Sequence, residues 1–148
     1  MPAERLTLEL TESATQKAIR LMDTISRLRL KGIGISLDDF GTGYGSLIHL
    51  RSLPFTELKI DRSFVLDLEI SRDSRAITRA LIGLAHELGL SVTAEGVEEE
   101  KTLRTLAAFG CDHAQGFFIA RPLAAEVIPA WIRARAAAGT GDRLAKAC

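Results

Sequence analysis

Acidic side chains and one lysine recur at the ends of short apolar runs in this sequence. The stretch SLDDFGTGYGSL (36–47) places Asp38 and Asp39 side by side at the end of such a run and then becomes rich in glycine. Asp is depleted in strands, so this pair predicts a turn or a site rather than more strand. The other runs end in Glu9, Lys59, Asp61, Glu95 and Gln115.

Several carboxylates at one place require compensation of their charge. Unit charges about 4 Å apart at an effective dielectric of 20 interact by roughly 4 kcal/mol. Either some of the acids protonate or divalent cations neutralise them, and ligands that are all oxygen favour Mg²⁺ or Mn²⁺. Two such ions roughly 3.5–4 Å apart are the usual apparatus for phosphodiester hydrolysis.

The adjacent acids Asp38 and Asp39 pose a geometric problem, because successive strand residues point to opposite faces. Both can hold metal only if the strand is already turning, which the glycines after Phe40 permit. The simpler interpretation of any one strand-end acid is a residue of a surface turn. Agreement of four strands on the same end favours a site.

The elements that must position these groups are short strands alternating with helices. The expected strands are 6–10, 34–39, 57–61, 91–95 and 112–116. Gly32, Gly89 and Gly110 mark the ends of the helices that precede three of them. Strands that alternate with helices predict a parallel sheet, and in a (β/α)8 barrel the active site lies at the C-terminal ends of the strands. The fold class is therefore α/β.

Three helices carry recognisable signals. Ser13 with Gln16 forms a capping box that opens a helix to about Lys31. An apolar face at helical spacing is expected in the next helix, and a last amphipathic helix carries Val127, Ile128, Trp131 and Ile132. The expected face consists of Ala76, Ile77, Ala80, Leu81, Leu84, Ala85 and Leu88.

Composition narrows the class of protein. The 148 residues suit one domain with a real core, and the formal net charge is zero, so no global field points to a nucleic-acid polymer or an anionic membrane. The first residues lack the features of a signal peptide, and no apolar run approaches the roughly 20 residues of a membrane span. We expect a cytoplasmic protein.

Five motifs, in order and spacing, resemble the EAL family of cyclic di-GMP phosphodiesterases. They are LELTE (8–12), LDDFGTGYGSL (37–47), LKIDRSFV (58–65), AEGVE (94–98) and GCDHAQGFFIARPL (110–123). The resemblance implies a TIM-like (β/α)8 barrel of the EAL type. It also implies metal-dependent hydrolysis of one phosphodiester of cyclic di-GMP to a linear dinucleotide.

The resemblance assigns a role to each strand-end residue. Glu9 and Asp38 would ligate a first metal, and Asp38 would bridge to a second one held by Asp39 and Glu95. Glu95 would also act as general base, while Lys59 would orient the attacking water. The supporting roles fall to Asp61 beside the site, Gln115 near the substrate, and Glu12 with Glu98, which would anchor the loop after Asp39.

The sequence also departs from the family pattern. The Glu-Ala-Leu motif and the asparagine ligand of the following strand have no counterpart, and a complete barrel has about 250 residues. We expect about five βα units, a truncated domain over 1–138, a flexible tail over 139–148, and impaired turnover. The alternatives are a non-catalytic module that binds cyclic di-GMP or a protein, and a fragment of a longer phosphodiesterase.

An incomplete barrel has physical consequences. The strand 6–10 becomes an edge with unpaired backbone groups, which favours a homo-oligomer or a partner chain that covers it. The barrel also cannot close around its inward side chains, so apolar surface is expected to be exposed.

Overall fold

Five parallel strands form one sheet in the order β1-β2-β3-β4-β5. The computed structural model describes residues 2–12, 14, 22–41 and 50–137. The strands are β1 (Thr7–Thr11), β2 (Gly34–Phe40), β3 (Glu57–Ile60), β4 (Ser91–Ala94) and β5 (His113–Ala114). The expected strands and their parallel pairing are confirmed, although β5 is shorter than predicted.

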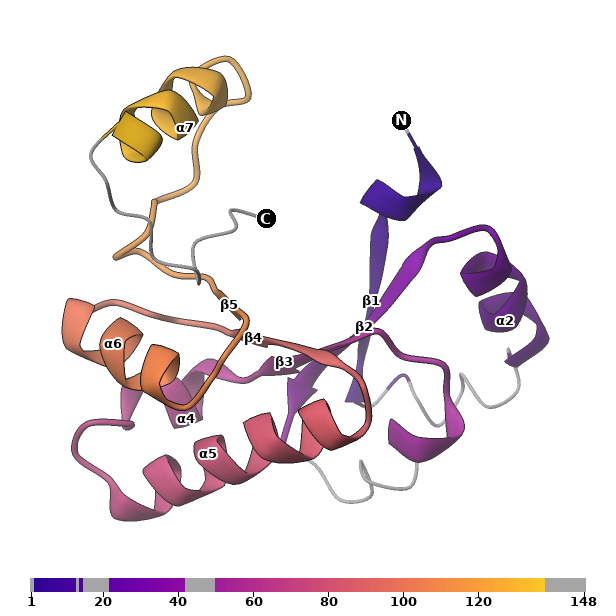
Figure 1. Cartoon of the computed structure of the whole chain (residues 1–148), viewed down its shortest axis with the longest axis horizontal. Helices are drawn as coiled ribbons and strands as arrows, with labels where there is room; N and C mark the ends of the chain where they lie inside the picture. The colour runs from indigo at the N-terminus through magenta and orange to yellow at the C-terminus, as the bar shows by residue number, and fades with distance from the viewer. Residues whose placement is uncertain (1, 13, 15–21, 42–49, 138–148) are drawn as a thin grey trace.

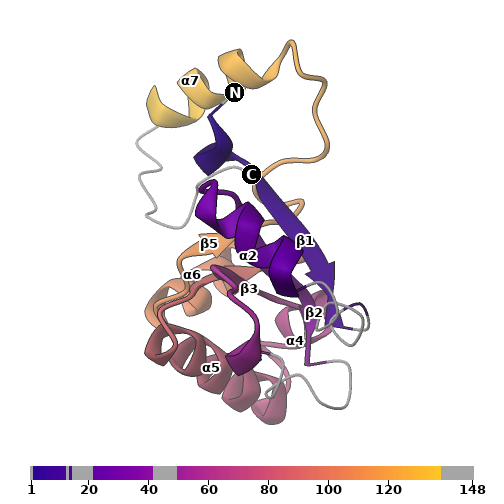
Figure 2. The ribbon, with the colours of Figure 1, turned by 90° about the vertical axis from the view of Figure 1, so that its right-hand side faces the viewer.

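Helices lie between the strands, and further helical segments precede β1 and follow β5, as Figures 1 and 2 show. They are the 3-10 turn η1 (Ala3–Arg5) and the helices α2 (Met22–Leu30), α4 (Arg62–Leu66), α5 (Arg72–Glu87), α6 (Glu100–Ala108) and α7 (Ile128–Ala137). Helix α5 contacts β3 and β4, and α2 contacts β2. Gly32, Gly89 and Gly110 all have positive φ, as expected for residues that end helices. No helix in the described part of the chain is both long and apolar enough to cross a membrane.

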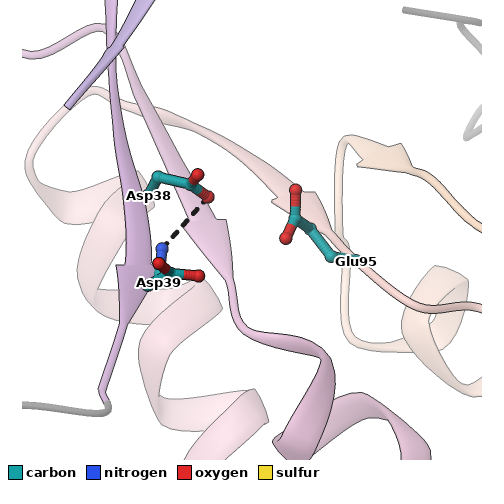
Figure 3. A group of neighbouring side chains, drawn as sticks. All are labelled: Asp38, Asp39 and Glu95. Carbon is teal, nitrogen blue, oxygen red and sulfur yellow. Dashed lines mark hydrogen bonds between the residues drawn. The ribbon is translucent and has the colours of Figure 1, made fainter. Parts of the chain in front are cut away.

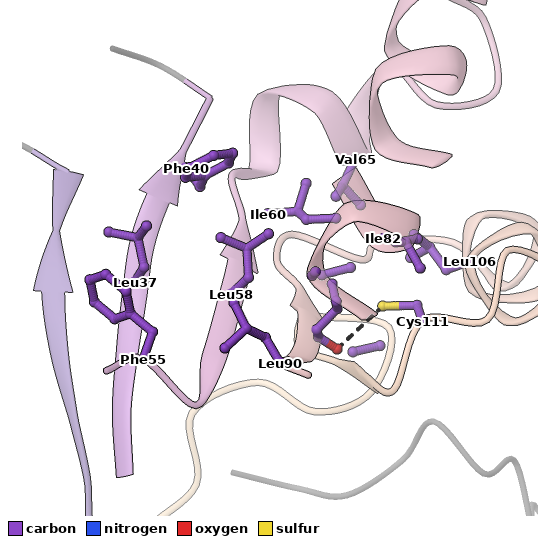
Figure 4. Packing of buried hydrophobic residues seen from close by; sticks show 14 of the residues in the cluster. Leu37, Phe40, Phe55, Leu58, Ile60, Val65, Ile82, Leu90, Leu106 and Cys111 are labelled. Carbon is purple, nitrogen blue, oxygen red and sulfur yellow. Dashed lines mark hydrogen bonds between the residues drawn. The ribbon is translucent and has the colours of Figure 1, made fainter. Parts of the chain in front are cut away.

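The hydrophobic core lies between the sheet and its helices (Figure 4). Leu37, Leu58 and Ile60 come from the strands and are completely buried. Ile82 of α5 and Leu106 of α6 pack against this face from the helical layer. Burial of such side chains stabilises the fold by about 1.5–3 kcal/mol for each one.

The buried face of α5 differs from the predicted one. The helix buries Thr78, Ile82 and Ala85, whereas Ile77 and Leu88 are 41% and 44% exposed. The apolar residues of this helix spread over a wider arc than one sheet contact covers. Register against β3 and β4 therefore decides which side of the arc is buried.

The opposite face of the sheet is polar. Side chains alternate between the two faces of a strand, so those that share a face with Lys59 are hydrophilic or glycine in every strand. They are Thr7, Glu9, Thr11, Gly34, Ser36, Asp38, Glu57, Ser91, Thr93 and His113. Apolar surface is exposed, as expected, but the expectation that it would lie on the inward face is wrong for the described residues. The exposed apolar side chains instead include Leu30, Ile70, Phe117 and Ile132.

Strand β1 pairs only with β2 within the described residues, which confirms the expected edge. Helix α7 buries none of its residues, so its predicted apolar side is largely exposed, with Val127 at 47% and Ile132 at 51%. The capping box at Ser13 and the predicted tail 139–148 lie outside the described residues, as does most of the loop after Asp39.

Candidate active site

A buried lysine lies at the centre of the strand-end acids. Lys59 of β3 is 5% exposed, although it carries a full charge. Its Nζ atom lies 2.6 Å from Oε1 of Glu95, 2.9 Å from Oε1 of Glu9 and 3.4 Å from Oδ1 of Asp38. Parallel pairing produces this arrangement, because it brings the same ends of β1, β2, β3 and β4 together.

Electrostatics within the group is strongly coupled. Burial alone would lower the pKa of Lys59, but its hydrogen bonds to Glu95 and Glu9 and the charges of Glu95 and Asp38 raise that pKa above its usual range. Burial raises the pKa of Glu95, and the hydrogen bond from Lys59 opposes this rise only in part. Lys59 therefore stays charged, and Glu95 becomes a better proton acceptor than an exposed glutamate.

Three carboxylates converge near the ends of β2 and β4 (Figure 3). One oxygen from each of Asp38, Asp39 and Glu95 lies within 4.8 Å of the others. Asp38 and Asp39 come from the end of β2, whereas Glu95 directly follows β4. Burial and the charges of Asp38 and Asp61 raise the pKa of Asp39, and the charge of Lys59 opposes this rise only in part.

The backbone of Asp39 solves the problem of two adjacent acids on one side. Asp39 has φ of 57°, in the left-handed region, and the register between β2 and β3 shifts between Leu37 and Phe40. Its amide donates a hydrogen bond of 3.0 Å to Oδ1 of Asp38. The strand therefore turns at Asp39 itself, before the glycines that the sequence pointed to.

The donor set of this group suits a hard divalent cation. All three side chains offer carboxylate oxygen, which Mg²⁺ and Mn²⁺ prefer. Among the described residues, Glu9 lies outside this three-acid group. Its carboxylate instead forms an ion pair with Lys59.

The remaining predicted residues lie near strand ends and differ in their exposure to solvent. Asp61 accepts a hydrogen bond of 2.9 Å from the amide of Ser63 and caps α4; burial would raise its pKa, but the bonds from Ser63 lower it. Gln115 is exposed just after β5. Glu12 is half-buried just after β1, and Glu98 is exposed after β4. The loop 42–49, most of what these two residues were predicted to anchor, lies outside the described residues.

One polar contact on the inward face of the sheet was not predicted from the sequence. Thr93 of β4 donates a hydrogen bond to Oε1 of Glu57 in β3, on the same face as Lys59. The signal was present, because Glu57 and Lys59 are two residues apart and must therefore share a face of the strand. This contact couples β3 to β4 directly beside the candidate site.

A family model and several known proteins match this chain. The model described as EAL domain matches residues 1–122. The chain belongs to the EAL domain family. Cyclic di-GMP phosphodiesterase PA2567 of Pseudomonas aeruginosa is 44% identical over 129 residues, which are 86% of this chain and 22% of that protein. The bifunctional diguanylate cyclase/cyclic di-GMP phosphodiesterase MucR of the same organism is 46% identical over 82% of this chain and 18% of that protein.

Solved EAL domains share the fold. The structure of the P. aeruginosa MucR phosphodiesterase in complex with cyclic di-GMP superposes with a TM-score of 0.79, at 43% identity over 85% of this chain and 51% of that one. The EAL domain of Mycobacterium smegmatis DcpA gives a TM-score of 0.78 at 39% identity, over 95% of this chain and 61% of that one. These similarities confirm the predicted TIM-like barrel of the EAL type. This chain spans 51% of the first solved chain and 61% of the second, so it corresponds to a part of the domain.

Proposed function

We propose that this EAL domain segment hydrolyses one phosphodiester bond of cyclic di-GMP to the linear dinucleotide, with Mg²⁺ or Mn²⁺ as cofactor. The observation that carries the proposal is the convergence of Asp38, Asp39 and Glu95 beside buried Lys59. Relatives named as cyclic di-GMP phosphodiesterases support the substrate.

The acids are assigned to metal binding. Asp39 and Glu95 would hold one ion, Glu9 would hold another, and Asp38 would touch both. The bound cations would supply Lewis-acid chemistry, which makes water nucleophilic near neutral pH and offsets the charge of the phosphate. Lys59 offsets part of the negative charge of these acids. With bound cations offsetting the rest, its ammonium group would be able to interact with the phosphate of the substrate.

Glu95 is assigned to proton transfer. Its carboxylate would accept the proton of the attacking water while the new bond from water oxygen to phosphorus forms. One phosphorus–oxygen ester bond then breaks, and the ribose oxygen that leaves takes up a proton from solvent. Lys59 would orient the same water, which is consistent with the distance of 2.6 Å between its Nζ atom and Oε1 of Glu95.

Three further roles complete the proposal. Asp61 supports the site by fixing the start of α4, next to the end of β3. Gln115 contacts the substrate, for which its exposure after β5 is suitable. Glu12 and Glu98 position the loop that follows Asp39.

A second candidate function is a module that binds cyclic di-GMP without turning it over. One observation favours it: Glu9 is paired with Lys59 and lies outside the three-acid group, which leaves the first metal with fewer ligands. We therefore expect turnover to be impaired in this chain. A second copy or a partner strand on the edge of β1 is the proposed means of completing the site.

The test is hydrolysis of cyclic di-GMP by the purified chain with Mg²⁺ or Mn²⁺, with the linear product followed by chromatography. Glu95→Gln is expected to abolish the product, and Glu100→Gln, on the exposed start of α6, is the matched control. Product from the wild type and from Glu100→Gln, but not from Glu95→Gln, supports the enzymatic function. A folded chain that binds cyclic di-GMP by calorimetry but forms no product supports the binding module instead.

A further inference from the structure

The loop that carries Glu95 is held by the loop that follows β5. The amide of Gln115 donates to the carbonyl of Ala94 at 2.8 Å, and the amide of Val97 donates to the carbonyl of Gln115 at 3.0 Å. The amide of Phe118 donates to the carbonyl of Val97, also at 3.0 Å. These bonds bracket Glu95 on both sides along the chain.

Gly116 makes this contact possible. A Cβ atom on Gly116 would lie 2.2 Å from the carbonyl oxygen and 2.3 Å from the nitrogen of Val97. Both are backbone atoms of a completely buried residue, so no side chain can turn aside to make room. Any larger residue at this position must push the two loops apart.

The opposite side of the Glu95 loop is equally confined. Gly96 has φ of 72°, and a Cβ atom there would lie 2.6 Å from Cβ of Arg62, the first residue of α4. The amide of Glu95 itself donates to the carbonyl of Ile60 at 3.1 Å. The loop is thus fixed between the end of β3 and Gly116, and it cannot yield toward α4 when it is pushed from the β5 side.

We propose that Gly116 is a positioning residue for Glu95. Its missing side chain lets the loop after β5 hold the Glu95 carboxylate within reach of Lys59, Asp38 and Asp39. A displaced loop would withdraw one of the three carboxylates and so weaken divalent-cation binding, even though Gly116 touches neither metal nor substrate. This inference rests on the proposed metal site and assigns it a further residue.

The experiment compares Gly116→Ala with Gly89→Ala in the full chain. Gly89 has positive φ, so an alanine there strains the backbone, but a Cβ atom at this position meets nothing within 4 Å. Gly89 precedes β4, whereas Glu95 follows it, so this variant controls for general destabilisation at the opposite end of the strand. Mn²⁺ affinity is measured by electron paramagnetic resonance, and circular dichroism checks the fold. We expect at least a tenfold weaker affinity for Gly116→Ala and an unchanged one for Gly89→Ala.

Wild-type Mn²⁺ affinity in folded Gly116→Ala would overturn the inference. Should Gly116→Ala not fold, Gly96→Ala is the second variant, because it displaces the same loop from the Arg62 side and should show the same loss. If the wild-type chain binds no Mn²⁺, the proposed metal site fails, and the positioning of Glu95 is judged on the nitrogen resonance of the Lys59 ammonium group. That resonance should be protected in wild type and Gly89→Ala and lost in Gly116→Ala; its retention would refute the positioning role.

Discussion

The Nζ atom of Lys59 lies 2.6 Å from Oε1 of Glu95, although the two residues are 36 positions apart in the sequence. Lys59 is inside the sheet, and Glu95 is the first residue after the neighbouring strand. The same ammonium group also contacts Glu9 and Asp38. One buried cation therefore holds the ends of four strands together electrostatically.

Lys59→Met should destabilise the chain at pH 7 by about 3 kcal/mol, since it leaves the buried part of the acid group without its counter-charge. Unfolding in urea, followed by circular dichroism, measures the loss. Lys101→Met is the matched control, because the side chain of Lys101 is 71% exposed in its pair with Glu69 and should cost less than about 1 kcal/mol. Equal losses for both variants would contradict the central role of Lys59.

Asp39→Asn should weaken Mn²⁺ binding by an order of magnitude or more. Asn tolerates the left-handed backbone that Asp39 adopts, so the variant removes a carboxylate while preserving the turn of the strand. Calorimetric titration with MnCl₂ measures the affinity. Asp23→Asn, at an exposed pair with Arg27 on α2, should leave it unchanged. A metal affinity insensitive to Asp39→Asn would rule out this residue as a ligand.

Glu69→Gln should lower stability in a pH-dependent manner. Glu69 accepts a hydrogen bond of 2.6 Å from Thr105 and pairs with Lys101 at 2.9 Å; these contacts lower its pKa below the ordinary 4.5. A lowered pKa in the folded state stabilises the fold above the pKa of the unfolded chain, and this gain is lost as pH falls through the folded value.

The difference between wild type and Glu69→Gln should therefore be about 1 kcal/mol near pH 7 and shrink toward zero in acid. Urea unfolding at a series of pH values measures it. Glu100→Gln, which alters an exposed pair with Arg104, should give a small difference at every pH. A difference for Glu69→Gln that grows in acid would have the wrong sign.

Cys111 should be unreactive in the native protein. The residue is buried, its Sγ donates to the carbonyl of His113 at 3.1 Å, and burial raises the pKa of the thiol to about 12. In a Cys148→Ser background, a thiol reagent at pH 8 should label no cysteine until urea unfolds the chain, because only the thiolate reacts. Rapid labelling of the native protein would show that this part of the core opens.

The sequence by itself determined the strands, their parallel pairing and the end at which the polar residues gather. Strand alternation is local, so Glu57 and Lys59 had to share a face, and the ends of βα units had to meet at one edge. The five motifs were also sufficient to identify the EAL resemblance, since their order and spacing need no three-dimensional information.

Only the tertiary structure decided how these residues meet. The turn of β2 at Asp39, one residue before Phe40, depends on register against β3, and the exposed side of α5 depends on where the helix lies on the sheet. The contact of Gly116 with Val97 joins two loops whose strands must pair first. Such features arise from contacts between segments far apart in the chain, and the local periodicity of a sequence does not encode the positions of their backbone atoms.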